Sequence, residues 1–319
     1  MTNTETTLTS TVKADLAHLQ LLDYLCARFP YRDREGWKGE IDQHRLMVNG
    51  KPGRPQTQLS KGTLVSYTSP RREPEVARDI VTIFEDEHLL VVDKPAPLPV
   101  HADGVFITNT LINILRVQTK NGDLSLGHRL DRETSGILVL AKDRQVTAKL
   151  MRSFEDSSVQ KTYLAVVRGE AGWKDLDVKG WMAPKKDSAI SIRQWLSPTK
   201  VDDGKDSFTR FKKLETLQGH TLLQCHPLTG RTNQIRVHLE AAGFPIVGDK
   251  LYGRTDDEFI AYVTHMKKGG DQKTGGAWDH PRHLLHAWKL SLKHPVTGAP
   301  MQWEAPMRGD MLGFVASKR

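Results

Sequence analysis

The chain has 319 residues, of which 38% are hydrophobic and 26% are charged, a balance typical of a globular protein with a hydrophobic core. No run of residues approaches the ~18 apolar positions that a membrane helix requires. The only cysteines, Cys26 and Cys225, lie far apart in the sequence. The composition therefore argues against a membrane span and a disulfide scaffold, and it favours a reducing cytoplasm. The 46 Lys and Arg residues outnumber the 38 Asp and Glu residues, which favours a polyanionic partner where other signals agree.

The N-terminal part is predicted to be a disordered end, then a small domain, then a linker. Residues 1–14 are polar and rich in Thr, lack the segments of a signal peptide, and are expected to be disordered. Residues 15–68 show two short helical patterns, then a strand that runs into an Asn49-Gly50 turn, and a last strand. Residues 69–78 are charged and rich in Pro, as is typical of a linker.

Residues 79–319 carry the patterns of one larger domain. Apolar runs predict strands over 80–84, 89–93, 137–140, 161–169, 220–225 and 284–292. Helices are expected over 110–119, after a cap at Asp143, and over 231–242, where Gly243 ends the helix. The stretch 255–280 is polar and rich in Gly, so we expect a loop there.

The most informative stretch is GHRLDRETSGILVLAK, residues 127–142. It places a turn dense in opposite charges directly before a buried strand, and Gly136 allows a sharp entry into that strand. Asp131 lies between Arg129 and Arg132, so its carboxylate would be held rigidly. Two interpretations remain open at this point, an active-site loop and a structural ion-pair turn.

Two further residues are candidates for the same site. Along the strand KTYLAVVRG, alternation sends Tyr163 to the face opposite Thr162 and Leu164, although a half-buried strand Tyr is common. Arg231 follows a Gly and opens the predicted helix of PLTGRTNQIRVHLEAAGFPIVGDKLYG. Its side chain could project from a rigid base, or it could be a capping or surface arginine.

These blocks together resemble the RluA-type pseudouridine synthases. HRLDRETSGILVLAK closely matches that family's signature, and the likeness continues in order through the Tyr163 and Arg231 blocks to RHLLHAWKLSLKHPVTGAPMQWEAP. The resemblance implies an α+β catalytic domain over 79–319, built on a mixed, mainly antiparallel sheet. It also implies isomerisation of uridine to pseudouridine within RNA, a reaction that needs neither cofactor nor metal.

The resemblance also implies roles for individual residues. Asp131 would be the catalytic carboxylate, acting as a nucleophile at ribose C1′ or as a base on the ribose. Tyr163 would stack on the flipped uracil and could relay a proton, and Arg231 would pair with Asp131. Arg129 would fill the gap left by the flipped base or contact phosphate. The remaining residues predicted to bind RNA are His128, Arg132, Asn233 and Arg236.

Two departures from the family pattern are visible. Asn233 stands where the family has His, and Asn can form hydrogen bonds but cannot titrate. The order of elements in residues 15–68 resembles an S4-like RNA-binding domain, yet His44 stands where that pattern has Gly, and Gln20-Leu21-Leu22 replaces its usual opening. A small αβ module without a known partner is the alternative for this domain.

Other functional classes would require residue patterns that this sequence does not show. A non-catalytic RNA-binding or ribosome-assembly protein on the same fold would be expected to lose Asp131, Tyr163 or Arg231, and all three are present. A hydrolase built on His128 would need a Ser or Cys nucleophile in a tight elbow, and no Gly-x-Ser-x-Gly occurs. His280, His283 and His286 could suggest zinc, but a strand would scatter them over both faces. We therefore expect a monomeric enzyme without metal, acting on ribosomal RNA first and transfer RNA second.

Overall fold

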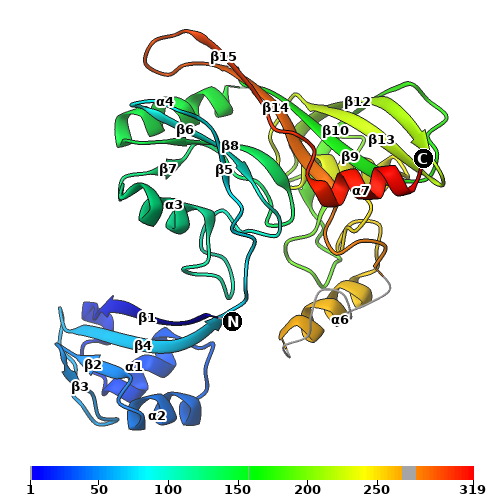
Figure 1. Cartoon of the computed structure of the whole chain (residues 1–319). Coiled ribbons are helices and arrows are strands. Elements are labelled where there is room, and N and C mark those ends of the chain that lie inside the picture. Colours follow the sequence, from blue (N-terminus) through cyan, green and yellow to red (C-terminus); the bar gives the residue numbers. More distant parts are fainter. Residues whose placement is uncertain (1, 157, 268–277) are drawn as a thin grey trace. The chain divides into compact units, whose positions relative to one another are not determined.

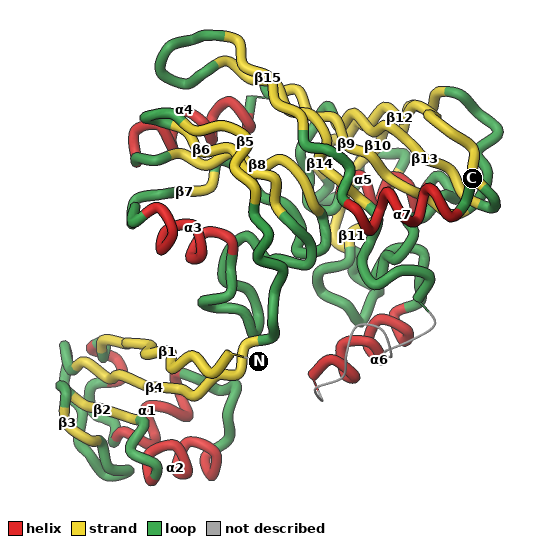
Figure 2. Tube along the Cα trace, viewed as in Figure 1, coloured by secondary structure: helices red, strands yellow, loops and turns green. Residues whose placement is uncertain are grey.

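The computed structural model describes residues 2–156, 158–267 and 278–319 (Figure 1). The chain divides into two compact units, one formed by residues 1–75 with 105–108 and the other by 76–104 with 109–319. Figure 2 shows the helices and strands of each. No helix in the described ranges combines the length and the apolar composition needed to cross a membrane.

The smaller unit consists of a sheet and two short α-helices. Its strands are β1 (Thr2–Thr11), β2 (Leu46–Val48), β3 (Lys51–Pro52) and β4 (Leu64–Glu73), and its helices are η1 (Ala14–Leu16), α1 (Leu21–Arg28) and α2 (Arg34–Asp42). The sheet order is β1-β4-β2-β3. Asn49 and Gly50 both have positive φ, 49° and 77°, which a tight hairpin between β2 and β3 requires. The expected order of two helices, a hairpin and a last strand is therefore correct.

The N-terminal segment, expected to be disordered, is a strand. β1 pairs antiparallel with β4 along its whole length, from Thr2 opposite Glu73 to Thr11 opposite Leu64. Thr is a good strand former, and Val12, which follows at once, is 1% exposed in the core of this unit. The prediction was wrong because the polar composition of the segment suggested disorder. The segment forms a strand because it pairs with the edge of β4, which is distant in the sequence.

The predicted linker over 69–78 is also partly wrong. β4 continues to Glu73, so the division between the two units falls after Glu75. Beyond Tyr67, β4 has β1 as its strand neighbour while β2 has already ended. Pro70 therefore lies where one edge of the strand needs no hydrogen bond, which is where Pro is tolerated in sheets.

The larger unit is built on an 11-stranded sheet with the order β11-β10-β12-β13-β9-β14-β8-β6-β5, to which β15 adds next to β14 and β7 next to β8. Its strands are β5 (Val81–Glu85), β6 (Leu89–Lys94), β7 (Ser125–Leu126), β8 (Ser135–Ala141), β9 (Gln160–Arg168), β10 (Asp175–Pro184), β11 (Gln194–Ser197), β12 (Lys205–Leu217), β13 (His220–Pro227), β14 (Leu285–Lys293) and β15 (Pro300–Glu304). β14 and β8 run parallel, and the other described pairs in this sheet are antiparallel. The predicted α+β class with a mixed, mainly antiparallel sheet is confirmed.

Helices cover both faces of this sheet. The helices of the larger unit are α3 (Leu111–Thr119), α4 (Arg144–Glu155), α5 (Gln234–Ala241), α6 (Asp256–Lys267) and α7 (Gly309–Ser317). Alternate residues of β8 point to opposite faces: Leu138 and Leu140 share a core with α3, whereas Ile137 and Val139 share a core with α4. Figure 1 shows α3 and α4 on opposite sides of these strands. β8 is buried on both faces, which gives the loop before it a rigid base.

Helix α6 lies in the stretch expected to be a loop. Thr255 and Glu258 form a reciprocal cap, since the Glu258 carboxylate accepts from the Thr255 N–H at 2.8 Å and the Thr255 hydroxyl accepts from the Glu258 N–H at 3.2 Å. This Thr-x-x-Glu pattern is a helix-start signal that the polar composition masked. Residues 268–277 of the same stretch lie outside the described residues.

Gly136 allows β8 to join two neighbours at once. It pairs with Lys94 of β6 and with Ala287 of β14, has φ 108°, and a Cβ added there would overlap the Ala287 carbonyl. We expect Gly136→Ala to lower the free energy of unfolding by about 2 kcal/mol or more, because strain and overlap add. Thermal and urea unfolding measure the loss. Gly122→Ala, which has open space around it, is the matched control, and equal stability of the two variants would contradict the assignment.

Candidate active site

The loop that carries Asp131 is held through its backbone. The Arg132 carbonyl accepts from the Leu98 N–H at 2.9 Å and from the Lys94 ammonium at 3.2 Å. Lys94 is fully buried and also donates to the carbonyls of Pro95 and Leu98. Burial holds the pKa of Lys94 well below its usual value, so this lysine is a buried donor whose three acceptors are all main-chain oxygens. It fixes the backbone directly after Asp131.

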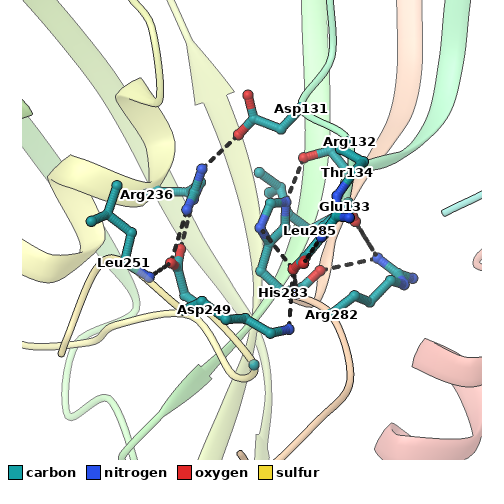
Figure 3. Close-up of polar contacts among 12 residues, drawn as sticks. Asp131, Arg132, Glu133, Thr134, Arg236, Asp249, Leu251, Arg282, His283 and Leu285 are labelled. Carbon is teal, nitrogen blue, oxygen red and sulfur yellow. Dashed lines mark hydrogen bonds and ion pairs between the residues drawn. The ribbon is translucent and has the colours of Figure 1, made fainter. Parts of the chain in front are cut away.

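Glu133 holds the same loop through its side chain and its main-chain carbonyl. Its carboxylate accepts from the Lys250 ammonium at 3.1 Å and from the His283 N–H at 3.0 Å, while its carbonyl accepts from Arg282 at 3.1 Å. Glu133 and Lys250 are 8% and 4% exposed. Figure 3 shows Glu133 beside His283 and Arg282. A buried carboxylate with several donors is rigid, so Asp131 projects from a fixed base.

Arg236 of α5 is the partner of Asp131. One guanidinium nitrogen of Arg236 donates to Asp131 Oδ2 at 2.8 Å, and two others grip both oxygens of Asp249 at 2.6 and 2.9 Å (Figure 3). Asp249 is fully buried and also accepts from the N–H groups of Leu251 and Tyr252. Burial alone would lower the pKa of Arg236, but Asp249 and then Asp131 raise it well above its usual value. Arg236 is therefore a permanent cation fixed independently of Asp131.

Asp131 keeps one oxygen available. Its side chain is 36% exposed, and in the described part of the chain Oδ1 has no hydrogen-bond partner, whereas Oδ2 is held by Arg236. A carboxylate that is oriented through one oxygen and open at the other is poised to meet a ligand.

Asn233 completes the support of Arg236. Its amide oxygen accepts from Arg236 at 3.1 Å, and its amide nitrogen donates to the Tyr252 hydroxyl at 3.1 Å. Asn233 has φ 60°, a left-handed conformation that Asn adopts more readily than most residues. Because of this conformation α5 begins at Gln234, three residues after the start expected from the sequence.

The predicted pairing of Arg231 with Asp131 is wrong. Arg231 is exposed, and its Nε donates to the main-chain carbonyl of Asp206 at 2.9 Å. The physical reason is the late start of α5: Arg231 lies in the loop before the helix, whereas Arg236 lies inside the helix and reaches Asp249. The buried Gln234 fixes that loop, because its side chain accepts from the Arg231 N–H and donates to the Phe208 carbonyl.

Tyr163 lies on β9 between Cys225 of β13 and Ala287 of β14. It is half-buried and packs against apolar residues from both halves of the sheet. Burial and then the nearby negative charge of Asp131 raise the pKa of its phenol. The phenol therefore stays protonated at neutral pH, which favours a stacking role over a role as a base.

Of the residues predicted to bind RNA, the structure leaves Arg129 the most accessible. Arg129 is exposed and contacts the His101 ring at 3.1 Å. His128 instead stacks on Phe154 and accepts from the Val139 N–H; burial, and then the charge of Lys161, lower the pKa of His128 to about 3.

The other three predicted RNA contacts are engaged within the protein. The guanidinium of Arg132 contacts Glu133 and the hydroxyl of Tyr262, and Asn233 and Arg236 support the carboxylates. These residues, like His128, shape the site from inside. The sequence did not separate them from Arg129 because charge alone does not show which side chains find partners in the fold.

His283, just before β14, and His286 within β14 are structural. His283 contacts the Thr134 hydroxyl at 2.7 Å, and His286 contacts the Ser135 hydroxyl at 2.9 Å. Both hydroxyls belong to the segment that leads from Asp131 into β8. Within the described ranges, no three His, Cys, Asp or Glu side chains gather so as to hold a metal ion.

Sequence reasoning missed three residues that build the site, namely Lys94, Glu133 and Asp249. A signal existed for each of them. Glu133 and Asp249 lie within the blocks that resemble the family, two residues after Asp131 and in Gly-Asp-Lys-Leu-Tyr-Gly, and Lys94 precedes a Pro at the end of a predicted strand. Their roles depend on contacts between distant segments, which spacing does not reveal.

Comparisons with known proteins identify the family to which the chain belongs. Residues 88–241 match the family model described as RNA pseudouridylate synthase. The ribosomal large subunit pseudouridine synthase D of Nitrosomonas europaea is 31% identical over 99% of this chain and 89% of its own length. The chain belongs to this family. The ribosomal large subunit pseudouridine synthase C of Escherichia coli is 35% identical over 85% of this chain and 82% of its own length.

A solved structure supports the fold of this family member. The human RNA pseudouridylate synthase domain containing 4 superposes with a TM-score of 0.57 at 25% identity, covering 73% of this chain and 90% of the human one. The chain is thus an isomerase that acts on RNA, and the Asp131–Arg236 pair lies in the matched region.

The correction from Arg231 to Arg236 can be tested with matched variants. Arg236→Lys keeps the positive charge but cannot grip Asp249 and reach Asp131 together, so we expect pseudouridine formation to slow by about 10²-fold through misplacement of Asp131. Arg231→Lys should turn over at close to the unmodified rate. Single-turnover assays on RNA measure both, and thermal melts confirm that each variant is folded. A larger loss in Arg231→Lys than in Arg236→Lys would contradict the geometry.

Proposed function

We propose that this enzyme converts specific uridines of large-subunit ribosomal RNA to pseudouridine, with Asp131 as the catalytic carboxylate. The proposal rests on the hydrogen bonding of the Asp131 carboxylate. Oδ2 accepts from Arg236, and in the described part of the chain Oδ1 has no hydrogen-bond partner. The choice of ribosomal RNA is supported by the names of relatives that this chain matches over most of its length. Transfer RNA is the second candidate substrate.

The reaction needs one well-placed carboxylate. The bond from uracil N1 to ribose C1′ breaks, the base turns, C5 bonds to C1′, and the C5 hydrogen leaves as a proton while N1 gains one. Asp131 acts on the ribose, as a nucleophile at C1′ or as a base. A single carboxylate does not fit the two-carboxylate arrangement of glycoside hydrolases, and with no net gain or loss of atoms the chemistry requires no cofactor.

The target base must leave its stack before it can react. Tyr163 offers an aromatic face on which the flipped uracil stacks. Arg129, exposed on the loop that carries Asp131, is suited to fill the gap in the RNA or to contact phosphate. Arg236 keeps Asp131 oriented while the base turns.

The smaller unit serves as an S4-like RNA-binding domain in this proposal. Its order of two helices, a hairpin and a last strand fits that pattern, and the net positive charge of the chain favours RNA. One copy of the chain supplies Asp131, Arg236 and Tyr163, so we propose that the enzyme acts as a monomer. In bacteria such as those that carry the named relatives, ribosomal RNA is made in the cytoplasm, and we place the enzyme there.

Asp131→Asn tests the catalytic assignment. The amide oxygen can still accept from Arg236, so we expect the fold and RNA binding to persist while turnover falls by at least about 10³-fold, as when a catalytic nucleophile is removed. The measurement is tritium release from RNA labelled at uracil C5, with ribosomal and transfer RNA offered separately. The exposed Asp175→Asn is the control. Activity of Asp131→Asn near that of the unmodified enzyme would refute the role of Asp131, and release from transfer RNA alone would refute the substrate.

Deletion of residues 1–72 tests the role of the smaller unit. The larger unit has its own sheet and cores, so we expect RNA affinity to fall by about tenfold or more, since several phosphate contacts are lost, while the single-turnover rate at saturating RNA changes little. Filter binding and single-turnover kinetics separate these effects. If the truncated and full-length proteins bind RNA equally, the smaller unit is not an RNA-binding domain.

A further inference from the structure

Lys161 is a half-buried lysine beside the active site that the mechanism has not used. It lies on β9 two residues before Tyr163, so the two side chains point to the same face of the strand. The two Cα atoms are therefore about 7 Å apart along the strand. Whatever stacks on Tyr163 comes within reach of the long side chain of Lys161.

The surroundings of Lys161 are the two loops that build the site. A methyl group added to Gly230, in the loop before α5, would lie 3.5 Å from the Lys161 ammonium nitrogen. The positive charge of Lys161 also contributes to lowering the pKa of His128, at the start of the loop that carries Asp131. Lys161 is thus placed between the segments that lead to Asp131 and to Arg236, and Gly230 presents no side chain that would cover it.

Unlike three other buried or half-buried lysines, Lys161 has no acceptor for its ammonium group in the part of the chain that the structure describes. Lys94 donates to three carbonyl oxygens, Lys250 to a carboxylate, and Lys213 to a carbonyl oxygen. In the described residues no hydrogen bond or ion pair involves the ammonium group of Lys161. Burial lowers its pKa, as expected for an ammonium withdrawn from water without compensation. An unpaired ammonium withdrawn from water destabilises the protein when no ligand is bound. A hydrogen-bond acceptor on a bound molecule would offset this desolvation cost.

We propose, on the basis of the function proposed above, that Lys161 binds a phosphodiester group of the RNA strand next to the target uridine. A full negative charge satisfies a desolvated ammonium better than a neutral carbonyl does, and RNA carries one such charge per nucleotide. The glycine at position 230 leaves room for a backbone group to approach. Lys161 thereby fixes the RNA strand while Tyr163 holds the base and Asp131 acts on the ribose.

The test compares Lys161→Met with Lys161→Arg and with the exposed Lys174→Met. RNA affinity is measured as a function of salt in an Asp131→Asn background, which prevents turnover. Loss of one phosphate contact should lower the slope of log Kd against log salt by about 0.7–0.9. We expect this change in Lys161→Met, recovery in Lys161→Arg, and no change in Lys174→Met. With Asp131 present, KM should rise more than kcat falls.

A structural role for Lys161 predicts a different result. Replacing an unpaired, partly buried ammonium with an apolar side chain of similar length should leave the melting temperature unchanged or raise it, so a large fall in melting temperature would overturn the proposal. An affinity loss with an unchanged salt slope would identify an uncharged contact, such as a uracil carbonyl, and would also overturn it. If the unmodified enzyme releases no tritium from any RNA, the proposed function fails; if it is active and Lys161→Met binds RNA with the same affinity and slope, only this inference fails.

Discussion

The geometry of the candidate active site depends on one arginine held between two carboxylates. Asp249 is buried and engaged by backbone N–H groups, and it grips Arg236 through two hydrogen bonds. Arg236 therefore keeps its position independently of Asp131. It orients Asp131 through a single hydrogen bond. Removing one partner from a buried ion pair costs about 3–5 kcal/mol, so orientation of the Asp131 carboxylate and stability of the surrounding fold depend on the same contacts. The arrangement leaves the second oxygen of Asp131 without a hydrogen-bond partner in the described part of the chain.

The buried charged residues that contact the Asp131 loop fix the position of that loop. They do not stabilise the fold more than apolar residues would. Lys94 and the Glu133–Lys250 pair lie in a region where apolar residues of equal size would stabilise the fold as well or better. What apolar residues cannot do is bind main-chain carbonyls and N–H groups at fixed points. Lys94 holds the carbonyl of Arg132, and Glu133 holds the N–H of His283. The loop that carries the partly exposed Asp131 is thereby held at fixed points of its backbone.

Local patterns predicted local structure well, and they failed where distant contacts decide. The apolar run of β8, the Asp143 cap and the Asn49-Gly50 turn depend on neighbours within a few residues, and each was recognisable from the sequence. The choice between Arg231 and Arg236 was not, because it depends on Asp249 and on where α5 begins. β1 was missed for the same reason, since its partner strand lies more than fifty residues away.

Asn233 shows why a departure from the family pattern can preserve the site. The position requires a left-handed backbone, which Asn tolerates, and a side chain that accepts from Arg236 while donating to Tyr252. The two ends of an amide satisfy both demands in one fixed orientation. A histidine at this position would offer similar hydrogen bonds when neutral, but once protonated it could no longer accept and would repel the guanidinium of Arg236. Asn removes that dependence on pH, so the hold on Arg236, and through it on Asp131, does not change with the protonation of this neighbour.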